Sequence, residues 1–143
     1  MKAYLKILVV STLIGIFIAI LYFKKLKQDD IFVLNTLEKV SIFQVGVFSS
    51  YDNAINYTYN YGNAGIYKKD NFYHVIIAVT INNQEQLKSY FKNKNINFII
   101  KEDIVNEKKY NVLKKYDLLL LKSNDEKAIN KINKESVTLF LTK

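Results

Sequence analysis

Residues 41–50 read Ser41-Ile42-Phe43-Gln44-Val45-Gly46-Val47-Phe48-Ser49-Ser50, and Tyr51-Asp52-Asn53-Ala54 follow them. Phe43, Val45 and Val47 alternate with residues of mixed character, so a β-strand here has one apolar face and one face that carries the amide of Gln44. The two serines at the end of this stretch suit the start of a helix, because their hydroxyl groups accept hydrogen bonds from free backbone amides. The stretch therefore predicts a strand that leads directly into a helix.

The pattern of strand and helix is repeated up to residue 101. The expected elements are a helix over residues 51–61, strands over 66–69 and 72–79, a helix over 82–94 and a strand over 96–101. Asp70-Asn71, between the two middle strands, suits a tight turn. This order is that of the split βαβ arrangement. The sequence predicts an α+β, RNP-like fold with a four-stranded antiparallel sheet, both helices on one face, and the other face free for a ligand.

The sequence after residue 102 changes to helical spacing. An amphipathic helix is expected over residues 104–121, from apolar residues three, four and seven positions apart. A second helix is expected from Asn124 or Asp125 onward, and residues 137–142 fit either its last turns or a terminal strand. The helical extension, residues 103–143, either packs on the domain of residues 40–102 or forms a partner-binding hairpin. The four leucines at 118–121 cannot share one narrow face, so we expect the domain and the final helix to cover different ones.

An uncharged stretch of seventeen residues, 7–23, lies near the amino terminus. Its length approaches the roughly 20 apolar residues that cross a hydrocarbon core, so we expect a transmembrane helix within an anchor of residues 1–28 with basic flanks. A cleaved signal peptide is the alternative, since Lys2 and Lys6 form a basic start. No small-x-small cleavage pattern follows the stretch, which favours the uncleaved anchor. Residues 29–39 are expected to form a short linker.

The region of residues 40–101 resembles the SPOR domain, a bacterial module that binds peptidoglycan. The resemblance rests on Gln44, Gly46, Phe48, Ser49 and Ala54, which match the family's first strand and helix start, and on Tyr73-His74-Val75-Ile76-Ile77-Ala78, which matches a later Tyr-Arg-Val-x-Val-Gly strand. Two positions depart from the family pattern. His74 stands where the family has arginine, and Ala78-Val79-Thr80 replaces a Gly-Pro-Phe corner.

The resemblance implies a binding protein of the cell envelope, acting in division or sporulation. Its expected partners are peptidoglycan glycan strands stripped of stem peptides, the cytoplasmic membrane, and other envelope proteins. The glycan would lie on the free sheet face, at Ile42, Gln44, Gly46, Phe72, His74 and Ile76. That ligand requires an extracellular carboxyl-terminal domain on a single-pass membrane protein. The lysines that flank residues 7–23 favour the opposite orientation, but by a difference of only one charge.

Two other functions fit the sequence. The sheet or the carboxyl-terminal helices could hold an envelope protein, which would make the chain an adaptor. RNA binding is the third candidate, because RNA-recognition motifs share this strand order, but the first strand lacks their paired stacking aromatics. The formal net charge of +8 suits an anionic polymer or surface.

Catalysis has little support in the sequence. The chain contains one histidine and no cysteine, and no Gly-x-Ser-x-Gly elbow accompanies His74. We therefore expect no enzyme activity, no metal and no cofactor, and nucleic acid is not favoured as a partner.

Overall fold

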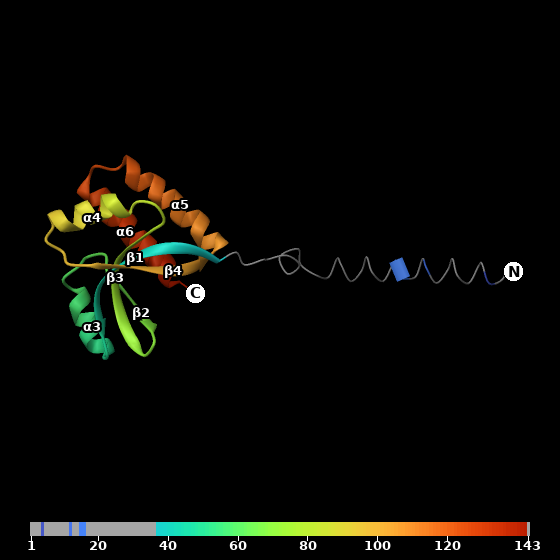
Figure 1. Cartoon of the computed structure of the whole chain (residues 1–143), viewed down its shortest axis with the longest axis horizontal. Coiled ribbons are helices and arrows are strands. Elements are labelled where there is room, and N and C mark those ends of the chain that lie inside the picture. The colour runs from blue at the N-terminus through green and yellow to red at the C-terminus, as the bar shows by residue number, and fades with distance from the viewer. Residues whose placement is uncertain (1–3, 5–11, 13–14, 17–36, 143) are drawn as a thin grey trace. The chain divides into compact units, whose positions relative to one another are not determined.

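The computed structural model describes residues 37–142, together with Tyr4, Thr12, Gly15 and Ile16. A four-stranded antiparallel sheet lies at the centre of residues 37–142 (Figure 1). Its strands are β1 (Leu37–Phe48), β2 (Gly65–Lys69), β3 (Phe72–Thr80) and β4 (Ile99–Asn106), in the spatial order β2-β3-β1-β4. A helix follows β1 and another follows β3. The predicted split βαβ order of the sheet is therefore found.

Strand β1 is a central strand that pairs with β3 on one side and with β4 on the other. Its pairing with β3 shifts twice: Phe43 lies opposite Ala78 and Gln44 opposite Ile76, so that Ile77 has no opposite residue. Gln44 lies opposite Ile76 and Gly46 opposite Val75, so Val45 of β1 has no opposite residue on β3. Such bulges increase the local twist of a strand and change the face to which its side chains point.

The turn between β2 and β3 has the predicted form. Asp70 and Asn71 both have positive φ angles, 51° and 64°. A two-residue hairpin turn with positive φ at both positions matches the right-handed twist of the strands that it joins, and Asn and Asp tolerate this conformation better than most residues.

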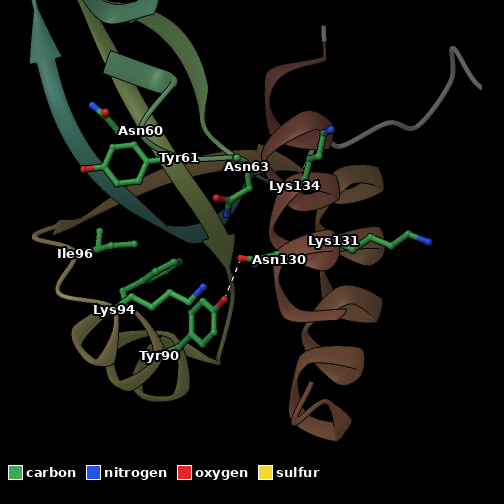
Figure 2. A pocket seen from close by; sticks show the side chains of 11 residues that line it. Asn60, Tyr61, Asn63, Tyr90, Lys94, Ile96, Asn130, Lys131 and Lys134 are labelled. Carbon is green, nitrogen blue, oxygen red and sulfur yellow. Dashed lines mark hydrogen bonds between the residues drawn. The ribbon is translucent and has the colours of Figure 1, made fainter. Parts of the chain in front are cut away.

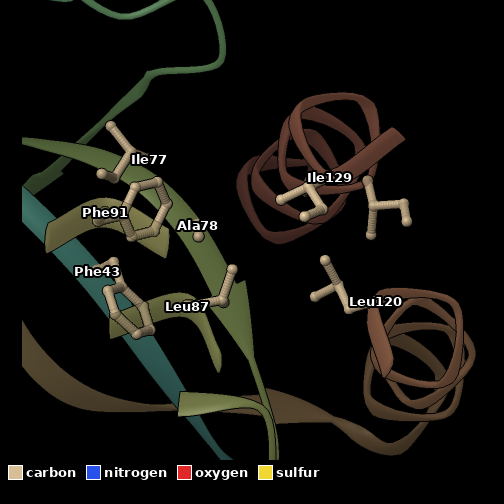
Figure 3. Packing of buried hydrophobic residues seen from close by; sticks show 8 residues of the cluster. Phe43, Ile77, Ala78, Leu87, Phe91, Leu120 and Ile129 are labelled. Atoms are coloured by element: carbon tan, nitrogen blue, oxygen red, sulfur yellow. The ribbon is translucent and has the colours of Figure 1, made fainter. Parts of the chain in front are cut away.

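The first face of the sheet carries α3 (Tyr51–Thr58) and α4 (Gln84–Asn93). Phe43 of β1 is fully buried there, with its ring centroid 5.5 Å from that of Phe91 and 5.1 Å from that of Phe98. Figure 3 shows Phe43 and Phe91 in this cluster, with Leu120 and Ile129 reaching it from two further helices. Residues of the expected extension thus belong to this core.

The second face of the sheet is covered, although we expected it to be free. Helices α5 (Glu107–Lys122) and α6 (Glu126–Leu141) form the cover. Ile42 and Ile76 share a buried cluster with Leu113 of α5 and Val137 of α6. Both helices begin at side-chain caps: Asn106 Oδ1 accepts from the Lys109 amide, and Asp125 Oδ2 accepts from the Ala128 amide.

A buried carboxylate joins this cover to the rest of the fold. Asp117 of α5 is 5% exposed, and its side chain accepts three hydrogen bonds from the segment that links β3 to α4. The donors are the Thr80 hydroxyl at 2.7 Å, the Ile81 amide at 3.0 Å and the Asn82 amide at 2.7 Å. The backbone carbonyl of Asp117 accepts a fourth bond, from Asn83 Nδ2 at 2.6 Å.

Several predicted boundaries need correction. β4 runs over Ile99–Asn106 where the sequence predicts a strand over 96–101 and a helix from 104, because the strand continues to pair with β1 as far as Leu37. That pairing also turns the last residues of the expected linker into strand; residues 29–36 lie outside the described part. Residues 137–141 are helical, so the alternative of a terminal strand is wrong.

The fold class predicted from the sequence includes a transmembrane helix ahead of the sheet, and the structure corrects this for the residues that it describes. Among the described residues no helix is long and apolar enough to cross a membrane. A span needs about 20 apolar residues, and the longest helices, α5 and α6, have 16 residues with several charges each. Except for Thr12, Gly15 and Ile16, the predicted span of residues 7–23 lies outside the described residues.

The Asp117 carboxylate gives a first prediction. Asp117→Ala should lower the free energy of unfolding by about 3 kcal/mol, because it leaves two backbone amides and a hydroxyl group without their charged acceptor. Urea denaturation would measure the change. Lys108→Ala, on the exposed side of the same helix, is the control and should stay within about 0.5 kcal/mol of the native chain. Equal stability of the two variants would contradict the proposed importance of this carboxylate.

Gly65 gives a second prediction, because α6 packs directly on its α-carbon. A Cβ atom at this position would lie 2.4 Å from Leu141 Cδ1 and 2.6 Å from Val137 Cγ1. Gly65→Ala should destabilise the fold by about 1–2 kcal/mol through overpacking, and Val137→Ala in the same chain should recover part of that loss. Gly62→Ala is the matched control, since a Cβ there meets no atom within 4 Å. Thermal denaturation of the four chains would test this contact.

Candidate functional site

Four of the six residues predicted to bind glycan are buried. Ile42 and Ile76 are 0% exposed, Gln44 is 2% exposed and His74 is 8% exposed. Gly46 is half-buried, and only Phe72 has a largely exposed side chain, at 47%. With α5 and α6 in place, these six residues do not form an open binding face.

The structure does bring Gln44 and His74 together. His74 Nδ1 lies 2.8 Å from Gln44 Oε1, and His74 Nε2 lies 3.3 Å from the carbonyl oxygen of Lys69. The imidazole also stacks on Tyr67, with ring centroids 4.9 Å apart, and Tyr67 meets the edge of Phe140 from α6. Both ring nitrogens of His74 thus face oxygen atoms of the protein, so this pair belongs to the packed interior and not to an open face.

A cleft of about 640 Å³ lies elsewhere, where the segment after α3 faces α4 and α6. Figure 2 shows the side chains that line it. They are Asn60, Tyr61, Gly62, Asn63, Tyr90, Phe91, Lys94, Ile96, Asn130, Lys131 and Lys134. A smaller depression of about 320 Å³ runs beside the end of β1 and includes Gln44 and Gly46 of the predicted set.

Two asparagine amides, those of Asn63 and Asn130, give the cleft its hydrogen-bonding groups. Asn63 Nδ2 donates to the carbonyl oxygen of Ile77 at 2.6 Å, which fixes the side chain and leaves its own oxygen as an acceptor. The Tyr90 hydroxyl donates to Asn130 Oδ1 at 3.0 Å, the dashed line in Figure 2. The amide nitrogen of Asn130 then remains to donate to a ligand.

The cleft is also cationic. Lys94 forms an ion pair with Glu126, and its Nζ lies 5.0 Å from the centroid of the Tyr90 ring. The hydrogen bond to Glu126 is the main reason that the pKa of Lys94 is raised. Lys131 and Lys134 are exposed on α6, and within residues 37–142 neither takes part in an ion pair. Lys131 extends away from the other labelled side chains in Figure 2, so Lys134 is the unpaired lysine best placed for an anionic group in the cleft.

Tyr61 contributes an aromatic ring that stays neutral. Its hydroxyl donates to the Tyr57 hydroxyl at 3.2 Å. Burial, followed by this hydrogen bond and by electrostatic interaction with Tyr57, raises the pKa of Tyr61 to about 12. The ring thus offers an apolar surface without charge at any physiological pH.

The sequence pattern does not single out the residues of this cleft. Tyr90 and Phe91 have the spacing of an ordinary helix face, and the α6 residues lie 70 positions beyond Asn60-Tyr61-Gly62-Asn63. The amide-rich segment after the first helix is the only local signal. Its meaning depends on α6, whose position against this segment cannot be read from helical periodicity.

No protein-family model, curated protein or solved structure matches this chain. The resemblance to the SPOR domain stays a prediction.

The Tyr57–Tyr61 pair gives a third prediction. Tyr57→Phe should lower the pKa of Tyr61 from about 12 but leave it above 10.0, because burial is the larger cause of the shift. The folded state favours the neutral phenol of Tyr61. The contribution of this preference to the free energy of unfolding is therefore complete below about pH 10 and is lost as the pH rises toward 12. Tyrosinate absorbance, with Tyr61→Phe subtracted, would follow this group. Tyr59→Phe, 79% exposed in the native chain, should have no effect; an unchanged titration in Tyr57→Phe would contradict the pairing.

Proposed function

We propose that the protein binds a cell-wall glycan strand and that the strand lies in the cleft between the segment after α3, helix α4 and helix α6. One observation carries the proposal: asparagine amides, tyrosine rings and Lys134 converge on one cleft. The family resemblance supplies the class of ligand, and the cleft supplies a place for it.

The chemistry of a denuded glycan suits these groups. Its acetamido and hydroxyl groups are donors and acceptors for asparagine amides, which have both capacities. The apolar faces of its sugar rings match the rings of Tyr61 and Tyr90. Removal of the stem peptides leaves a free carboxylate on every second sugar, and Lys134 provides an ammonium group for it.

The size of the cleft is consistent with this use. Its volume of about 640 Å³ lies within the usual range for ligand pockets of roughly 300–1,000 Å³. Its groups are also held in place before a ligand arrives, since Asn63 and Asn130 are both hydrogen-bonded within the protein. Fixed side chains lose little conformational freedom on binding, which favours affinity.

Sedimentation with purified peptidoglycan tests the proposal. The full chain, in mild detergent, should sediment more strongly after an amidase has removed the stem peptides. Asn130→Ala should weaken binding about fivefold, as expected for the loss of one hydrogen bond. Lys134→Gln should weaken it by a similar factor, and the effect should shrink in high salt.

Matched controls separate the cleft from other surfaces. Asn111→Ala on α5 and Lys127→Gln on α6 change exposed side chains of the same types outside the cleft and should leave binding unchanged. Gln44→Ala tests the sheet face. If Gln44→Ala abolished binding in a chain that remains folded, while the cleft variants bound normally, the glycan would lie along β1, where Gln44 lines the smaller depression, and the cleft proposal would be wrong.

A further inference from the structure

Helix α5 exposes three neighbouring leucines. Leu118, Leu119 and Leu121 are 53%, 52% and 62% exposed, whereas Leu120 between them is fully buried. Helix α5 contacts both the sheet and α6, as the sequence led us to expect, yet of these four leucines only Leu120 is covered. Single exposed leucines are common on protein surfaces, but a contiguous group marks a surface that meets an apolar partner.

Lysines flank this group along the helix. Lys114 and Lys115 lie about one turn before Leu118, and Lys122 lies one turn after it. Residues three or four positions apart share a helix face, so these ammonium groups stand beside the leucines and not behind them. All three lysines are exposed.

The exposed side of α5 carries no acidic side chain between positions 108 and 122. Asp117 is the one acidic residue between positions 108 and 122, and its carboxylate faces inward, where it accepts hydrogen bonds from Thr80, Ile81 and Asn82. The outer side of the last turns of α5 therefore combines apolar groups with positive charge alone.

We propose that this outer face of α5 docks on an anionic lipid surface. Leu118 would enter the boundary of the acyl chains, with Leu119 and Leu121 on either side of it. The aliphatic stems of the lysines would cover apolar surface while their ammonium groups reach the lipid phosphates.

The convex shape of this surface favours lipid over an acidic protein. With 3.6 residues per turn, Leu119 lies about 100° around the helix from Leu118 on one side and Leu121 about 60° on the other, so the three leucines span about 160°. A fluid interface accommodates so broad a ridge, whereas a protein partner would need a matching groove. The docking face shares no residue with the glycan cleft, so failure of one proposal would not contradict the other.

The absence of cysteine from the chain allows a site-specific test. The full chain would carry one environment-sensitive fluorophore, on Leu121→Cys or, as a reference, on Tyr59→Cys, which is 79% exposed at the end of α3. Both would be added to phosphatidylcholine vesicles with and without phosphatidylglycerol, each containing lipids with a quencher on the acyl chain. Comparing two sites on one chain separates docking of α5 from attachment through any other segment.

Quenching at position 121 should exceed that at 59 and should rise with phosphatidylglycerol. The variant Lys114→Gln, Lys115→Gln, Lys122→Gln should reduce it steeply, since each lysine near an anionic surface changes partitioning about fivefold. Lys92→Gln on α4 is the charge control and should behave as the native chain. Equal quenching at both positions, or quenching at 121 that ignores anionic lipid, would overturn the proposal. A label at 121 shielded from both lipid and aqueous quenchers would also overturn it, by indicating a protein partner.

Discussion

The buried carboxylate of Asp117 joins the two parts of this fold. Its three hydrogen bonds stop β3 and position the start of α4, while its own helix lies over the second face of the sheet. A carboxylate that loses its water needs such donors, since an unpaired buried charge is strongly unfavourable. The Thr80 hydroxyl extends the network by accepting from the Asn83 amide. One side chain thus fixes the relative positions of β3, α4 and α5.

Covering of the second sheet face follows from the residues of β3. Residues 75–80 are all buried, which requires packing on both faces. A four-stranded sheet with two helices covers one face only, so α5 and α6 are needed to remove Ile42, Ile76 and Val79 from water. Burial of aliphatic side chains at about 25 cal/mol per Å² makes this cover a main part of the core. The fully buried Asn133 of α6, whose amide has no partner among the described residues, works against that gain.

The sequence predicts the sheet well because its signals are local. Alternation in residues 41–48, Asp70-Asn71 at the turn and helical spacing around Leu87 each depend on near neighbours. The position of α5 and α6 depends on contacts between residues far apart in the chain, such as Ile42 with Val137, which periodicity does not contain. One signal was present nevertheless: Val75-Ile76-Ile77-Ala78-Val79 is a continuous apolar run, typical of a strand buried on both faces. The cleft could not be predicted from the sequence, because α6 forms one side of it and the position of α6 depends on contacts between distant residues.

One face of helix α6 packs into the fold and another lines the cleft. Val137 and Ser136 point into the fold, where the Ser136 hydroxyl accepts from the Val79 amide, while Asn130 and Lys134 line the cleft. Any ligand that contacts the cleft face therefore binds only the state in which α6 lies on the sheet. Binding to one state stabilises that state by mass action. If a glycan occupies the cleft, it strengthens the cover over the sheet face, so the cleft and an uncovered sheet face cannot be used at once.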